Sequence, residues 1–209
     1  MKYIFVAGAP GSKWSSVVKT FYNSPSIDRS DYRDEWTFYF TPPWGFGLTL
    51  IHVGAYFDPG MSANLPEDFY TQSRDQLEAL FDSHFAPQGT GLKIIKSHIF
   101  SNHVDFLKQT WPDCAIVLVH RSDDDCLGGW VKTGGFDIGY PDYGPYYKNL
   151  KEMTRLIHQQ NCGIVDAFNK YSGTWVHNHR ELIQQLNIEP PAEDSGFEFS
   201  EYDMKVMII

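Results

Sequence analysis

The stretch from residue 4 to residue 18 most restricts what this chain can fold into. An apolar segment at 4–7 runs into Gly8, Ala9, Pro10 and Gly11, as expected for a buried strand that ends in a tight turn. Backbone N–H groups, a lysine and three serine hydroxyls then follow at what we expect to be the start of a helix. This combination favours a phosphate-binding loop, although an ordinary strand–turn–helix with a serine cap would show the same pattern.

The loop differs from the P-loop of nucleotide triphosphatases at its metal position. That pattern, G-x-x-x-x-G-K-[ST], has a glycine before its lysine and a Ser or Thr after it, which holds magnesium. Here Ser12 precedes Lys13 and Trp14 follows it, while Ser15 and Ser16 come too late to take the magnesium position. We therefore expect a loop that binds phosphate without an obligatory metal.

Composition indicates one domain, 1–209, in which residues 36–65 form an insertion. The 209 residues are 42% hydrophobic and 16% aromatic, enough to fill one core. A net charge of −9 argues against a general binder of nucleic acid or of anionic membranes. Three cysteines without a C-x-x-C pair predict reduced thiols and a cytoplasmic protein, and we expect no signal peptide and no membrane insertion.

Alternating strand and helix patterns predict an α/β fold of the three-layer P-loop type, with a central, mostly parallel sheet flanked by helices. Ser122 and Asn178 are each followed three residues later by an acidic residue and are expected helix caps, as is Ser101. Strands are expected at 36–40, 47–53, 92–98, 114–120 and 174–177, with an edge strand at 206–209. Helices are expected at 14–22, 66–85, 101–111, 122–132, 150–168 with a break near Gly163, and 178–186.

Polar residues follow three of the expected strands, at 11–16, 96–98 and 121–122. The carboxyl ends of parallel strands meet at one edge of a sheet, where ligands bind, so we expect these residues to converge. The aromatic-rich segment 36–57 is interpreted either as a hairpin that packs into the core or as the wall of an acceptor pocket.

The loop 9–16 also resembles a motif of the sulfotransferases that use 3′-phosphoadenosine 5′-phosphosulfate (PAPS). Its sequence, Ala-Pro-Gly-Ser-Lys-Trp-Ser-Ser, is similar to the family's 5′-phosphosulfate loop, Y-P-K-S-G-T-T-W. Pro10, Ser12 and Ser15 align directly. Gly11 stands where the family has its lysine, and Lys13 stands where it has a glycine.

Two further motifs, in the same order along the chain, carry the resemblance. Residues 94–98, Ile-Ile-Lys-Ser-His, are similar to the strand F-x-K-T-H, whose histidine is the family's catalytic base. Residues 117–122 resemble the strand and turn in which an Arg, and a Ser eight residues later, bind the 3′-phosphate. Arg121 matches the arginine, and Gly129 occupies the serine position. The C-terminal R-K-G segment of cytosolic members has no counterpart.

This resemblance implies an enzyme that moves a sulfuryl group from PAPS to a hydroxyl or amine of a small-molecule acceptor and releases adenosine 3′,5′-bisphosphate. It implies His98 as general base and Lys13 as the group that stabilises the leaving phosphate. Among the chain's other histidines, His52 and His103 are the alternatives for the base. Because a sulfuryl group carries one negative charge, backbone amides and a lysine can suffice without a metal. The cofactor would be bound by Pro10, Gly11, Ser12, Lys13, Trp14, Ser15, Ser16, Lys96, Arg121 and Gly129.

Other interpretations remain open. His98 could instead hydrogen-bond a loop, Lys13 could be solvated, and Arg121 could pair with the acidic run 123–125. For the whole chain, one alternative is a nucleotide or small-molecule kinase on a P-loop fold, which requires a magnesium ligand after the lysine. The other alternative is a non-catalytic nucleotide-binding relative.

Overall fold

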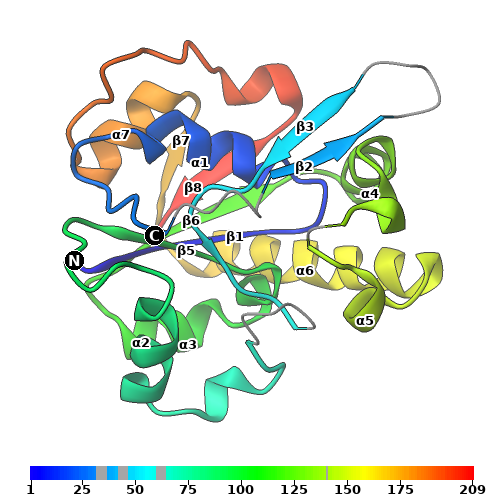
Figure 1. Cartoon of the computed structure of the whole chain (residues 1–209), viewed down its shortest axis with the longest axis horizontal. Coiled ribbons are helices and arrows are strands. Elements are labelled where there is room, and N and C mark those ends of the chain that lie inside the picture. The colour runs from blue at the N-terminus through cyan, green and yellow to red at the C-terminus, as the bar shows by residue number, and fades with distance from the viewer. Residues whose placement is uncertain (32–36, 42–46, 60–64, 140) are drawn as a thin grey trace.

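The structure, a computed structural model, describes residues 1–31, 37–41, 47–59, 65–139 and 141–209. A six-stranded sheet with the strand order β4–β5–β1–β6–β8–β7 is flanked by helices (Figure 1). The chain is therefore α/β, as expected. Four neighbouring strands are parallel: β4 (Ala55–Tyr56), β5 (Lys93–Lys96), β1 (Tyr3–Gly8) and β6 (Ala115–His120).

The sheet as a whole is mixed, which corrects the expectation of a mostly parallel sheet. β8 (Lys205–Ile208) runs antiparallel to both of its neighbours, β6 and β7 (Thr174–Val176). After α7 (His179–Leu186), residues 187–204 return the chain to the end of the sheet at which β6 finishes. β8 starts there, since Lys205 pairs with His120, and it therefore runs antiparallel to β6. β8 was also expected at an edge. It lies inside the sheet, between β6 and β7, and Val206 and Met207, which point to opposite faces, are both buried.

β1 shows why the sheet carries helices on both faces. All six of its residues are buried, and alternate residues join different core clusters. Tyr3 and Phe5 pack with α2 (Arg74–Asp82), α3 (Val104–Thr110) and the C-terminal half of α6 (Leu150–Lys170). Ile4 and Val6 pack with α1 (Trp14–Tyr22) and α7. Figure 1 shows these two helices on the opposite face of the sheet from α2, α3 and α6.

Capping and close packing explain where three helices differ from their expected ranges. The expected helix at 66–85 is shorter because Ser73 and Gln76 form a capping box that starts α2, after a 3₁₀ turn, η2 (Phe69–Thr71). Ser101 does not cap α3: its hydroxyl donates to the His98 carbonyl within η3 (His98–Asn102). α6 is continuous through Gly163, where a Cβ would lie 2.4 Å from the Ser101 carbonyl oxygen, so the glycine permits close packing.

Ser122 and Asn178 cap α4 (Asp123–Lys132) and α7 as expected. A separate antiparallel hairpin, β2 (Thr37–Phe40) with β3 (Leu48–Ile51), falls in the expected insertion, of which residues 36, 42–46 and 60–64 lie outside the described residues. None of the described helices is long and apolar enough to cross a membrane. The other short helices are η4 (Gly135–Asp137), α5 (Gly144–Tyr147) and η5 (Phe199–Tyr202).

Candidate functional site

The loop between β1 and α1 is held in a conformation that presents the start of α1. Gly11 has a φ of +78°, and a Cβ there would lie 1.8 Å from the Cys126 carbonyl oxygen, so only glycine fits against α4. The backbone of Lys13 also adopts the left-handed conformation, with a φ of 65°, which lysines rarely adopt. Lys13 makes no side-chain cap to α1, and the Ser16 N–H donates to the Lys13 carbonyl at 2.8 Å, so the N–H groups of Trp14 and Ser15 are the ones left at the start of the helix.

The three expected strand ends converge, which confirms the topological argument. β5 and β6 flank β1, and contacts link all three ends. The His98 Nδ1–H donates to the Gly8 carbonyl at the end of β1. The Arg121 Nη1 donates to the Gly11 carbonyl at 3.1 Å. The loop is therefore held from both sides by residues that follow neighbouring strands.

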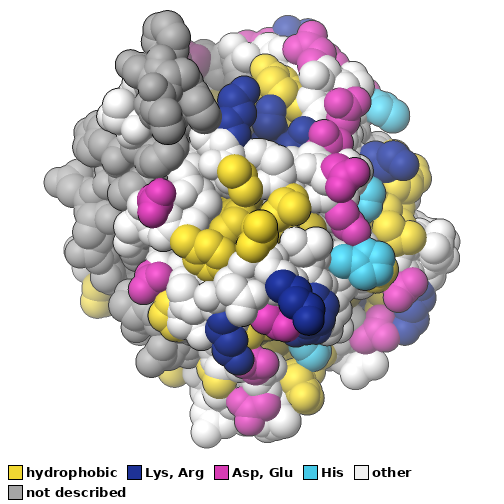
Figure 2. Space-filling view, turned by 90° about the vertical axis from the view of Figure 1, so that its right-hand side faces the viewer, with side chains coloured by type: hydrophobic (Ala, Val, Ile, Leu, Met, Phe, Trp, Pro, Cys, Tyr) yellow, Lys and Arg dark blue, Asp and Glu magenta, His cyan; other side chains and the backbone are white. Residues whose placement is uncertain are grey.

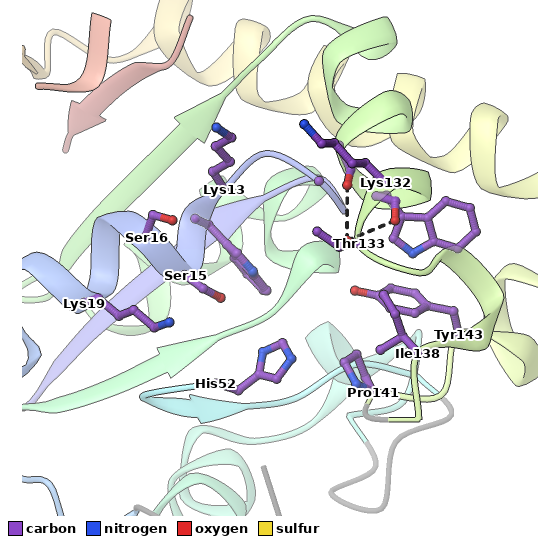
Figure 3. Close-up of a pocket in the computed structure, with 14 residues that line it drawn as sticks. Lys13, Ser15, Ser16, Lys19, His52, Lys132, Thr133, Ile138, Pro141 and Tyr143 are labelled. Atoms are coloured by element: carbon purple, nitrogen blue, oxygen red, sulfur yellow. Dashed lines mark hydrogen bonds between the residues drawn. The ribbon is translucent and has the colours of Figure 1, made fainter. Parts of the chain in front are cut away.

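A cavity of about 370 Å³ opens beside this loop. Figure 3 shows Lys13, Ser15, Ser16 and Lys19 along one side, and side chains from α4 and the following loop on the other. Its described lining contains three lysines and no Asp or Glu. The cavity is therefore suited to an anion with an apolar portion. The lining residues are Gly11, Lys13, Trp14, Ser15, Ser16, Lys19, His52, Gly129, Trp130, Lys132, Thr133, Ile138, Pro141 and Tyr143.

Two lysines of the cavity, Lys13 and Lys19, have lowered pKa values, which a bound anion would raise. Burial lowers the pKa of Lys13, and the positive charges of Arg121 and Lys132 lower it further. The Lys13 ammonium lies 4.2 Å from the centre of the Tyr202 ring. Burial also lowers the pKa of Lys19. On the face shown in Figure 2, Lys and Arg side chains gather beside Asp and Glu side chains, next to an exposed apolar patch.

His98, the expected general base, lies behind the cavity wall. The indole of Trp14 stacks on its imidazole with 4.0 Å between the ring centres, and His98 is 1% exposed. Because Nδ1 donates to Gly8, Nε2 carries no proton in the neutral ring, and it lies 3.7 Å from an oxygen of buried Asp58. Burial lowers the pKa of His98, although Asp58 opposes the shift. Trp14 thus separates His98 from the cavity.

Lys96 is buried on the same side of β5 as His98. Its ammonium nitrogen lies 5.6 Å from the centre of the Trp14 ring and 5.5 Å from that of Tyr56. It has no hydrogen-bond partner among the described residues, and burial lowers its pKa to about 7. Burial also raises the pKa of nearby Asp31 to about 6. Like His98, Lys96 does not line the cavity.

Arg121 bonds to backbone carbonyls and also pairs with the acidic run, as one alternative predicted: its Nη2 lies 3.6 Å from the Asp125 Oδ1. Its Nε donates to the Tyr202 carbonyl at 2.9 Å, and its Nη1 donates to the Asp125 carbonyl at 3.2 Å as well as to Gly11. The guanidinium therefore joins the loop, α4 and the C-terminal segment, and it does not line the cavity. Gly129 lets α4 approach this group, because a Cβ there would lie 3.1 Å from the Gly11 carbonyl oxygen.

The structure thus brings some expected site residues to the cavity and leaves others out. Pro10 and Ser12 are buried within the loop, and His103 stacks on Tyr70 away from the cavity. Sequence reasoning missed Lys19 and Lys132. Helical periodicity could have found both, since they lie four residues after Ser15 and three after Gly129. Seven of the expected residues line the cavity: Gly11, Lys13, Trp14, Ser15, Ser16, His52 and Gly129.

Comparisons with known proteins assign this chain to no family. A scan of protein-family models found no match, and neither a search of curated proteins nor a search of solved structures found a similar chain. Within the described part of the chain, no group of three or more His, Cys, Asp or Glu side chains is arranged to hold a metal ion.

Proposed function

We propose that the cavity binds the 5′-phosphosulfate end of PAPS and that the protein transfers the sulfuryl group to a small-molecule acceptor. The observation that carries this proposal is the cavity at the start of α1, lined by three lysines and by no described carboxylate. The resemblance of three motifs to the sulfotransferases supplies the class of cofactor. The absence of a hydroxyl directly after Lys13 distinguishes the loop from that of a kinase.

The chain's residues fit the 5′ end of such a ligand. The first N–H groups of α1 and the hydroxyls of Ser15 and Ser16 would hold the phosphate oxygens, and Lys13 and Lys19 would balance their charge. The resemblance implies that Arg121 binds the 3′-phosphate. In the structure, however, the Arg121 guanidinium donates to three carbonyls. Lys132 is the lysine on the α4 side of the cavity, and it is the group available for a 3′-phosphate.

PAPS would supply the sulfuryl group, and the chain would position the reactants and accept a proton. Of the histidines considered for the general base, His52 is the one that lines the cavity, so the proposal gives it the role of accepting the proton of the attacking hydroxyl or amine in place of His98. His98 holds Gly8 at the end of β1 and thereby positions the loop. Trp130 and Tyr143 provide apolar walls for a ring of the ligand or acceptor.

A non-catalytic relative that only binds a nucleotide is the second candidate. The observation in its favour is that Trp14 covers His98, while Gly11 replaces the family's loop lysine. This candidate predicts binding of adenosine 3′,5′-bisphosphate without sulfuryl transfer. The enzyme proposal predicts both.

Calorimetric titration tests the proposal directly. We expect adenosine 3′,5′-bisphosphate to bind with micromolar affinity without magnesium, and ADP with magnesium to bind more weakly. Lys19→Met should reduce the affinity roughly tenfold, since it removes one charge from a phosphate site. Lys151→Met, a change at an exposed lysine outside the cavity, should leave it unchanged. Binding of ADP with magnesium alone would refute the proposal in favour of a kinase.

A further inference from the structure

A second group of reactive side chains lies outside the cavity, where α6 packs against the start of α4. Of the three cysteines, Cys114 and Cys126 are buried, and Cys162 is exposed. His158 precedes Cys162 by four residues on α6, which places both side chains on one face of the helix. The His158 Nε2 lies 3.6 Å from the Cys162 Sγ.

Asp123, the first residue of α4, completes the arrangement. Its Oδ2 lies 2.6 Å from the His158 Nδ1, so the imidazole donates its Nδ1–H to the carboxylate and keeps Nε2 free to accept a proton from the thiol. The other oxygen, Oδ1, accepts from the Asn161 Nδ2 at 2.7 Å. Asn161 is buried and also donates to the Arg121 carbonyl, so the carboxylate is held in place. The order thiol, imidazole, carboxylate is that of an activated nucleophile.

Other charged groups surround this cluster. From α4, Asp124 lies next to Asp123 in the sequence. On α6, Asp166 follows Cys162 by one turn, and Arg155 precedes His158 by three residues, where it pairs with Glu152. His120, at the end of β6, is influenced by the charge of Asp123. The acidic groups oppose a thiolate, so proton transfer to His158 is the activating contact.

We propose that Cys162 is a reactive thiol, activated by His158 and Asp123, that exchanges with low-molecular-weight disulfides of the glutathione type. The His158 Nε2 takes the thiol proton, and the Cys162 sulfur attacks one sulfur of the small disulfide. A mixed disulfide forms as the original S–S bond breaks, and the released thiolate takes the proton from the imidazolium. Because the other two cysteines are buried, neither is exposed to displace the attached group, and the mixed disulfide persists.

The test follows modification of each cysteine by mass spectrometry of peptides from the intact, folded protein. Oxidised glutathione is the probe, and rates are measured at pH 7 and at pH 9.5. We expect Cys162 to be modified at pH 7 roughly tenfold faster in the unchanged protein than in His158→Gln, a small effect for general-base assistance because the site is exposed. The difference should disappear at pH 9.5, where an ordinary thiol ionises without help.

Two further variants separate activation from simple exposure. Asp123→Asn should give an intermediate rate at pH 7, because the imidazole keeps its place near the thiol but loses the carboxylate. His177→Gln, at an exposed histidine outside the cluster, should react like the unchanged protein. Cys114 and Cys126 should stay unmodified throughout. Equal rates at pH 7 in the unchanged protein and in His158→Gln, both folded by circular dichroism, would overturn the proposal.

Discussion

Replacing Lys96 by methionine should stabilise the protein, and the gain should depend on pH. The buried ammonium of Lys96 has its pKa lowered from 10.5 to about 7 by burial. The unfolded chain therefore binds more protons than the folded chain between these two values, and the contribution of Lys96 to the free energy of unfolding rises with pH through this window. The difference between a pKa of 10.5 and one of about 7, at roughly 1.36 kcal/mol per tenfold change in proton affinity, corresponds to a cost of roughly 5 kcal/mol at pH 6.

Lys96→Met removes this cost while keeping the volume of the side chain. We expect urea unfolding at pH 6 to show the variant more stable by several kcal/mol, an order-of-magnitude figure from the same conversion. At pH 9.5 the advantage should shrink to roughly 1 kcal/mol. The folded protein then holds Lys96 uncharged, and the unfolded chain, with a pKa of 10.5, is only about one pH unit from losing the same proton. Lys151→Met is the matched control at an exposed lysine and should show no such pH dependence. An advantage of Lys96→Met that is equal at pH 6 and pH 9.5 would refute the reasoning.

Three other perturbations test the site. His52→Ala should lower the rate of sulfuryl transfer by roughly two to four orders of magnitude with little change in nucleotide affinity, measured by steady-state kinetics and calorimetry; an unchanged rate would remove His52 from the mechanism. Arg121→Gln should lower the free energy of unfolding by roughly 2–4 kcal/mol, because three carbonyls lose a partly buried donor. It should weaken adenosine 3′,5′-bisphosphate and adenosine 5′-phosphate equally, and a selective loss of the former would show that Arg121 binds the 3′-phosphate. Gly11→Ala should cost at least roughly 3 kcal/mol in chemical denaturation, since its Cβ would meet the Cys126 carbonyl at a positive φ; a change below 1 kcal/mol would mean that the loop shifts freely.

Much of the site's location could be predicted because it depends on neighbours in the sequence. The apolar run before Gly8 and the polar residues after it predict a strand that ends at a ligand-binding edge, and the contacts of His98 with Gly8 and of Arg121 with Gly11 confirm the convergence. The roles of individual side chains could not be predicted in the same way. Whether Arg121 faces a ligand or a carbonyl depends on Tyr202, which lies 81 residues away.

Local patterns along the chain specify the type of most elements and the position of the loop. Strand or helix follows from periodicity, and the start of a helix follows from a cap such as Ser122 or Asn178, both of which act over three or four residues. Long-range packing, in contrast, sets the antiparallel direction of β8 in the sheet and places Trp14 over His98. These outcomes depend on which surfaces remain unburied after the other elements have packed, and no local pattern encodes that competition.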